Sequence, residues 1–135
     1  MLTIFLGKYR LLRMFTLFVR ETFAAAHKIE LYHGKCENLH GHNFKVEAIF
    51  EGEHVGEEGM LLDFAVLKTM LREVVADLDH KYINDIPFFN ERASSSEYLA
   101  FYISGRIVEL LRKENITVKE VRVWESDNAY AAYRE

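Results

Sequence analysis

Alternating hydrophobic and polar positions predict strands at both ends of the chain. Residues Phe15 to Phe23 carry bulky side chains in rough alternation, and Phe44 to Glu51 alternates more clearly. This period is typical of a strand with one buried face. Val118 to Trp124 alternates strictly, and Tyr130 to Tyr133 has the pattern of a short final strand after a turn at Ser126 to Asn128. The pattern therefore predicts two early strands and two late ones.

A helical period separates these two pairs of strands. Apolar residues that recur every three or four positions predict an amphipathic helix over Phe64 to Asp77, with Asp63 as its N-cap. A second helix is predicted to begin within Ser94 to Glu97, where serine and glutamate have the spacing of a capping box, and to end near Asn115. The order β-β-α-α-β-β predicts an α+β fold with both helices on one face of a four-stranded antiparallel sheet.

The N-terminal segment is apolar enough to suggest a secretory signal. Lys8, Arg10 and Arg13 interrupt it, however, whereas a signal peptide carries an unbroken apolar region. We expect residues 1–13 to be an N-terminal extension, an ordered extra strand or a product of start-codon choice. With 135 residues in all, the chain has the length of one ordinary core, which predicts a single domain over residues 14–135.

Charge and composition exclude several kinds of partner. The 17 basic residues nearly balance the 21 acidic ones, so no large field of one sign is expected to attract nucleic acid or anionic lipid. No apolar run approaches the length of a membrane span. The single cysteine, Cys36, has no partner for an intrachain disulfide. These features predict a cytoplasmic protein that binds neither nucleic acid nor membrane.

Four of the six histidines lie between the first two predicted strands. His40 and His42 are two positions apart, so in extended backbone both imidazoles project from the same face. His27 is the natural third ligand if the two strands are neighbours. Three histidines with one open position form the ligand set of a catalytic zinc site, although copper and nickel also accept imidazole. A pair at this spacing arises by chance in roughly a quarter of such chains, so ordinary loop histidines remain the alternative.

Two further groups have the chemistry for proton transfer. Cys36 lies four residues before His40 in a polar segment, where a nearby zinc ion or protonated histidine would raise its thiolate fraction. A lone cysteine is otherwise more often a small buried hydrophobic residue. Asp79 and His80 follow the first helix and form a candidate acid–base pair in which the carboxylate orients the imidazole. Taken alone, Asp79 is equally well explained as a solvated residue at a helix end.

Taken together, six short motifs resemble the 6-pyruvoyltetrahydropterin synthase family, which includes the 6-carboxytetrahydropterin synthases. Six motifs in a fixed order are far more specific than any one of them. The resemblance extends from about Phe15 to Tyr133. The motifs are Phe23 to Lys28, Cys36 with His40 to Asn43, Gly59 to Phe64, Leu78 to His80 with Asn84 and Asp85, Ser95 to Glu97, and Trp124 to Ser126.

The resemblance implies a fold, a substrate and an assembly. The family has the tunnelling fold and acts as homo-hexamers of two stacked trimers, with active sites between subunits. The implied substrate is 7,8-dihydroneopterin triphosphate; the residues that bind its triphosphate are left unassigned. Three groups of site residues are implied: zinc ligands His27, His40 and His42; catalytic residues Cys36, Asp79 and His80; and substrate-binding residues Glu125, which anchors the pterin ring, Ser95 and Ser96.

The spacing around Cys36 bears on the product. Three residues separate Cys36 from His40, as in the 6-carboxytetrahydropterin synthases of queuosine biosynthesis and unlike the mammalian-type enzymes, so 6-carboxytetrahydropterin is the favoured product. Glu37 has the position of a glutamate in the related branch that forms 6-hydroxymethyl-dihydropterin for folate, and is either a loop charge or a second catalytic group. The alternatives are that product, 6-pyruvoyltetrahydropterin, a non-catalytic pterin-binding assembly subunit, or a structural zinc module.

Overall fold

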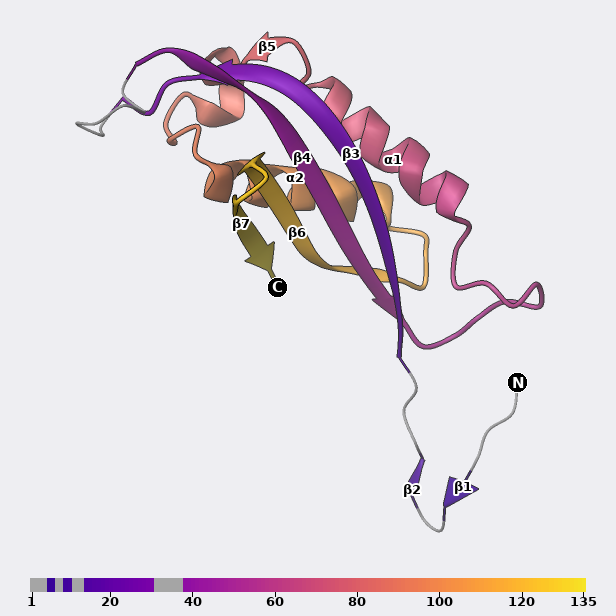
Figure 1. Cartoon of the computed structure of the whole chain (residues 1–135). Helices are drawn as coiled ribbons and strands as arrows, with labels where there is room; N and C mark the ends of the chain where they lie inside the picture. The colour runs from indigo at the N-terminus through magenta and orange to yellow at the C-terminus, as the bar shows by residue number, and fades with distance from the viewer. Residues whose placement is uncertain (1–4, 7–8, 11–13, 31–37) are drawn as a thin grey trace.

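The structure, a computed structural model, describes residues 5–6, 9–10, 14–30 and 38–135. Its longest strands are β3 (Phe15–His27) and β4 (His40–Gly52), which are antiparallel neighbours and form two adjacent arcs in Figure 1. Their register pairs Phe15 with Gly52 at one end and His27 with His40 at the other. Both strands reach further toward the histidines than the alternation predicted. The long pairing therefore determines where the histidines lie.

Five strands form the main sheet, in the order β5-β3-β4-β6-β7. β6 (Thr117–Ser126) and β7 (Ala129–Arg134) continue the antiparallel pairing, whereas β5 (Lys81–Tyr82) pairs with β3 in parallel. The predicted sheet had four strands, because a two-residue strand is too short to show a hydrophobic period. A separate two-stranded sheet contains β1 (Phe5–Leu6) and β2 (Tyr9–Arg10). That residues 1–13 are an extension, and residues 14–135 one domain, stays a prediction.

The two helices are α1 (Phe64–Ala76) and α2 (Ser96–Leu110), and two short 3-10 helices, η2 (Ile83–Asp85) and η3 (Pro87–Phe89), lie between them. Asp63 is the N-cap of α1, as predicted, and its side chain accepts a hydrogen bond from the Ala65 amide. The predicted capping box at Ser94 is wrong, because the N-cap of α2 is Ser95, whose hydroxyl accepts from the Tyr98 amide. Ser94 is thereby free for a different role.

The hydrophobic core lies between the sheet and the helices. α1 packs against β3, and α2 packs against β6 and β7. Figure 1 shows α2 crossing behind β4 and α1 running alongside β3, and the two helices contact each other, which agrees with the predicted α+β layer. No helix in the described part of the chain is long and apolar enough to cross a membrane. The largest fully buried apolar side chains are Phe44, Phe50, Leu67, Leu71, Leu78, Ile83, Leu99, Ile103 and Ile107.

The helix-free face of the sheet carries two buried carboxylates. Glu47 alternates with the core residues of β4 and is 5% exposed, and Glu120 on β6 is 4% exposed. Arg20 and the Trp124 indole donate hydrogen bonds to Glu47, and Arg122 and Arg134 donate to Glu120. Burial by itself raises the pKa of the Glu120 carboxyl, but the hydrogen bonds from Arg134 and Arg122 outweigh burial and lower the pKa below its usual value.

We expect Glu120→Gln to destabilise the protein at neutral pH by about 1.5 kcal/mol, the lower end for hydrogen bonds to a charged group, because Arg134 is largely exposed. A carboxyl with a depressed folded-state pKa contributes stability above its unfolded-state pKa of about 4.5 and loses it as pH falls through the folded-state value. Urea unfolding should therefore show a gap between parent and variant at pH 7 that closes in acid. A gap that persists unchanged in acid would contradict this assignment. Glu114→Gln, at an exposed position, is the control.

Candidate metal centre

Three imidazoles converge at the end of the β3–β4 pair. His27 pairs directly with His40 in the register, and His42 lies two residues further along the same face of β4. The ring centroid of His27 lies 4.5 Å from that of His40 and 5.2 Å from that of His42. The centroids of His40 and His42 are 4.8 Å apart. One ligand nitrogen from each ring lies within 4.8 Å of the others. The predicted trio therefore forms a cluster that can hold a metal ion.

Backbone carbonyls fix the protonation of two of these rings. His27 donates from Nδ1 to the Ser94 carbonyl oxygen, and His40 donates from Nδ1 to the Asn38 carbonyl oxygen, both at 2.6 Å. A carbonyl can only accept, so in the neutral rings each Nε2 carries a lone pair. Nε2 of His27 and Nε2 of His42 are buried and have no hydrogen-bond partner among the described residues. A buried nitrogen without a partner is costly, and a coordinated cation removes that cost.

Burial also favours the form of His27 that binds metal. Desolvation lowers the pKa of the His27 imidazole below its usual value, although the hydrogen bond to Ser94 and the charge of Glu125 act in the opposite direction. The neighbouring rings of His40 and His42 lower the pKa further. A neutral imidazole is the form that binds metal ions. The donor set, the orphaned nitrogens and the depressed pKa together fit a divalent metal ion of the kind that imidazole binds.

Glu125 lies beside the histidine cluster. Its carboxylate oxygens are 4.0 Å from Nε2 of His27 and 3.9 Å from Nε2 of His42. The Ser96 hydroxyl donates to Glu125 Oε1 at 2.8 Å, and both residues line a cavity of about 190 Å³ bounded by the start of β7. Ser95, in contrast, uses its hydroxyl to cap α2. Of the three predicted substrate-binding residues, Glu125 and Ser96 are thus in contact.

Asp79 and His80 form the predicted pair. His80 Nδ1 is 3.0 Å from Asp79 Oδ2, and Asp79 Oδ1 accepts from the Ala24 amide on β3 at 2.9 Å. The Ala24 hydrogen bond is the main cause that lowers the pKa of the Asp79 carboxyl, so the carboxylate stays ionised. His80 has a positive φ of 58° and donates its amide proton to the Ala24 carbonyl. Such a backbone is rare outside glycine and constrains the main chain from which the ring projects.

Not every predicted catalytic residue is joined to the cluster. Within the described ranges, no hydrogen bond or ion pair links Asp79 or His80 to the three histidines. The His80 side chain is 83% exposed. Cys36 and Glu37 lie outside the described residues, so their roles stay predictions. Sequence reasoning missed the carbonyls of Ser94 and Asn38, and no side-chain pattern could have revealed them, because every residue carries a carbonyl.

Fold and site together define an α+β protein with a candidate metal centre of three histidines and an adjacent carboxylate. The family model described as 6-pyruvoyl tetrahydropterin synthase matches residues 16–135. The 6-carboxy-5,6,7,8-tetrahydropterin synthase of Haemophilus influenzae is 28% identical over 146 residues, covering 90% of this chain and 100% of that protein. The 6-pyruvoyl tetrahydrobiopterin synthase of Dictyostelium discoideum is 31% identical over 127 residues, covering 85% and 92%.

A solved structure agrees with these relatives. The 6-pyruvoyl tetrahydropterin synthase of Caenorhabditis elegans superposes with a TM-score of 0.83 at 26% identity, over 92% of this chain and 97% of that one. The chain therefore belongs to the 6-pyruvoyl tetrahydropterin synthase family. The predicted family, the α+β class and a tetrahydropterin synthase-like enzyme are confirmed.

Proposed function

We propose that the enzyme converts 7,8-dihydroneopterin triphosphate, in a zinc-dependent reaction, into a 6-substituted pterin, with 6-carboxytetrahydropterin as the favoured product. The observation that carries the proposal is the convergence of three imidazoles, two with buried unpartnered Nε2 atoms, beside the carboxylate of Glu125. Three histidines leave one coordination position open for substrate, as catalytic zinc sites require.

The zinc ligands are His27, His40 and His42. His27 and His40 bind through Nε2, because their Nδ1 atoms donate to backbone carbonyls. A zinc ion held by these residues would supply Lewis-acid chemistry, which would lower the pKa of the substrate's side-chain hydroxyls and acidify the neighbouring C–H bonds. The three ligands also fix the position of the pterin side chain relative to the proton-transfer groups.

Cys36, Asp79 and His80 move protons. Cys36 is the base that removes a proton from the pterin side chain, a role that rests on its place four residues before His40. The Asp79 carboxylate holds His80 through Nδ1, which leaves His80 Nε2 to exchange protons. The triphosphate then leaves by elimination, which alone yields the three-carbon 6-pyruvoyl side chain. The 6-carboxy product also requires that one water add and that the C1′–C2′ bond break, which releases the other two carbons as acetaldehyde. The exposure of His80 supports an active site shared between subunits, to which this pair contributes across the contact.

Glu125 binds the pterin ring. Its carboxylate lies in the wall of the 190 Å³ cavity, where the 2-amino group and N3–H of a pterin can donate to the two oxygens. Ser96 holds one of these oxygens by a hydrogen bond. Because Glu125 also faces the histidines, the ring and the metal are close enough for the substrate side chain to reach both.

Assembly and product are the finer parts of the proposal. β3 pairs with β5 over only two residues, and β7 has β6 as its one partner in the main sheet. Both edges of the sheet therefore have backbone groups that can pair with a strand of another subunit, which supports a homo-hexamer built by strand pairing.

We place the enzyme in the cytoplasm. The relatives carry the names of both 6-carboxytetrahydropterin and 6-pyruvoyl synthases, so the favoured product follows from the spacing of Cys36 and His40. Formation of 6-hydroxymethyl-dihydropterin is the alternative, because Glu37 has the position of the glutamate in the branch that makes that product.

The test is to incubate the zinc-loaded protein with 7,8-dihydroneopterin triphosphate and to identify the product by mass spectrometry. We expect 6-carboxytetrahydropterin and about one zinc per chain. Glu125→Gln should weaken pterin binding about 10- to 100-fold, because the amide offers only one acceptor and no charge. Quenching of Trp124, the only tryptophan, measures that affinity.

Glu114→Gln is the matched control, since Glu114 is exposed and does not line the cavity that contains Glu125. It should bind pterin like the parent. If Glu125→Gln also binds like the parent, the assignment of Glu125 fails. If the zinc-loaded parent forms none of the three 6-substituted pterins, the proposed function itself is wrong.

A further inference from the structure

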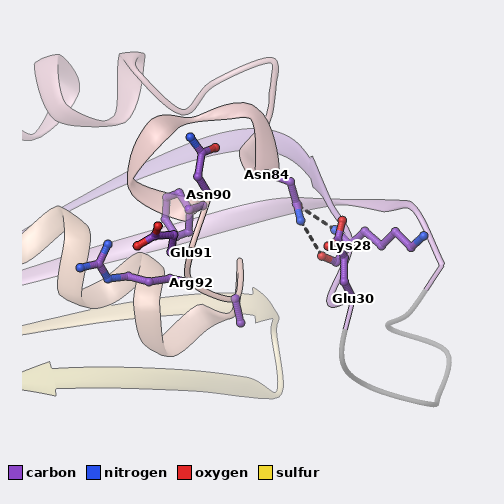
Figure 2. Close-up of a pocket in the computed structure, with 8 residues that line it drawn as sticks. Lys28, Glu30, Asn84, Asn90, Glu91 and Arg92 are labelled. Carbon is purple, nitrogen blue, oxygen red and sulfur yellow. Dashed lines mark hydrogen bonds between the residues drawn. The ribbon is translucent and has the colours of Figure 1, made fainter.

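A cluster of hydrogen bonds joins three segments directly behind His27. The Asn84 side chain, on η2, accepts from the Lys28 amide through Oδ1 at 3.0 Å and donates from Nδ2 to the Lys28 carbonyl at 2.8 Å. Figure 2 shows the Asn84 side chain directed at Lys28 with both hydrogen bonds drawn. One side-chain amide thus satisfies both backbone polar groups of the residue that follows His27 in the chain.

Ser94 connects the same cluster to the imidazole itself. Its hydroxyl lies 2.9 Å from Asn84 Oδ1 and 3.1 Å from the Lys28 carbonyl oxygen, and its own carbonyl accepts from His27 Nδ1. Ser94 is fully buried, so water does not compete for these contacts. The main chain after His27 and the hydrogen-bond partner of its ring are therefore held by one set of interactions, with Asn84 at the centre.

We propose that Asn84 is a positioning residue for the metal centre. By holding the Lys28 backbone and Ser94 together, Asn84 keeps the Ser94 carbonyl opposite His27 Nδ1, so the imidazole keeps its proton there and presents Nε2 to the metal. This inference rests on the proposed zinc site. Partners that orient a metal-binding imidazole set its tautomer, and their loss typically weakens metal affinity about 10- to 100-fold. Asn84 does not contact the imidazole itself and acts on it through Ser94 and the Lys28 backbone.

The decisive variant is Asn84→Asp, which keeps the size of the side chain. A carboxylate can still accept from the Lys28 amide and the Ser94 hydroxyl, but it replaces the donor to the Lys28 carbonyl with an oxygen that repels it. We expect the zinc dissociation constant to rise about 10-fold or more and the visible spectrum of bound Co²⁺ to change. Asn90→Ala is the matched control, because Asn90 is exposed and lines the same cavity of about 400 Å³ as Asn84. Its zinc affinity should equal the parent's.

A readout on the metal-free protein separates positioning from general stability. The ¹⁵N spectrum of the histidine side chains should show the Nδ1–H tautomer of His27 in the parent and in Asn90→Ala, and a mixture of tautomers in Asn84→Asp. Zinc affinities are compared below the unfolding temperature of each metal-free variant. A folded Asn84→Asp protein with the parent's zinc affinity and tautomer would overturn the inference.

Three outcomes have different consequences for the inference. If Asn84→Asp does not fold, Ser94→Ala decides, because it keeps the carbonyl that faces His27 and removes the hydroxyl that contacts Asn84 and the Lys28 carbonyl. Parental zinc affinity and tautomer in that variant overturn the inference. If the parent binds no zinc, the proposed zinc site and this inference fail together. If the parent binds zinc and the variants match it, this inference alone fails.

Discussion

Replacing His42 with alanine should leave the purified protein nearly free of zinc and lower its turnover of the pterin substrate at least about 10³-fold. The variant keeps His27 and His40, but two imidazoles are one fewer than the three protein ligands of a catalytic zinc site. A metal that polarises a substrate oxygen contributes several kcal/mol, and each 1.36 kcal/mol corresponds to about tenfold in rate. Zinc content and turnover are measured on the same preparation.

His54→Ala is the control for this prediction. Its side chain is 55% exposed, and its one ion pair among the described residues is with Glu53 rather than with a member of the cluster. It should keep one zinc per chain and parental turnover. The prediction fails if folded His42→Ala, checked by circular dichroism, retains equimolar zinc or parental activity.

The second large effect is expected at Cys36. Cys36→Ala should lower turnover about 10²- to 10⁴-fold, the usual contribution of a positioned acid or base, while zinc remains at one per chain. Turnover should fall while zinc content stays the same, because the thiol is proposed as the proton acceptor and the three histidines suffice to hold the metal. Single-turnover kinetics with a substrate deuterated at the abstracted position would report the proton-transfer step.

Glu37→Ala distinguishes the two candidate bases, because Glu37 is the neighbour of Cys36 and carries the alternative product assignment. If Cys36 is the base, Glu37→Ala should keep most of the parental rate and the same product. The reverse pattern, with Cys36→Ala active and Glu37→Ala inactive, would reject Cys36 and favour formation of 6-hydroxymethyl-dihydropterin.

Hydrophobic periodicity was sufficient to predict the core of every long element but not its ends. β3 runs on through Ala24 to His27, where three alanines give no contrast between faces, and β4 begins at His40, where a glycine separates two histidines. Pairing between β3 and β4, rather than alternation of hydrophobic and polar residues, extends both strands at the histidine end. β5 was missed because its two residues are fixed by contact with β3, including the hydrogen bond from the His80 amide to the Ala24 carbonyl.

The histidine trio was predictable because its spacing has a geometric meaning in extended backbone, and the resemblance of six motifs assigned the rest of the site. The hydrogen-bond partners were not predictable. Ser94 was interpreted as a helix cap, yet its carbonyl holds His27 from 67 positions away. Glu47 and Glu120 were unremarkable strand residues in the sequence. Their buried carboxylates are satisfied by Arg20 and Trp124 from the strands beside β4 for Glu47, and by Arg122 on the same strand and Arg134 on β7 for Glu120.

The contact between Ser94 and His27 has a consequence for biosynthesis. Translation delivers all three histidines early, but the carbonyl that fixes the His27 tautomer is made only after the whole of α1 has been synthesised. A nascent chain that stops before Ser94 holds the three rings without that restraint. For the proposed metal site, binding of the ion in its final geometry therefore requires a chain that extends at least to Ser94.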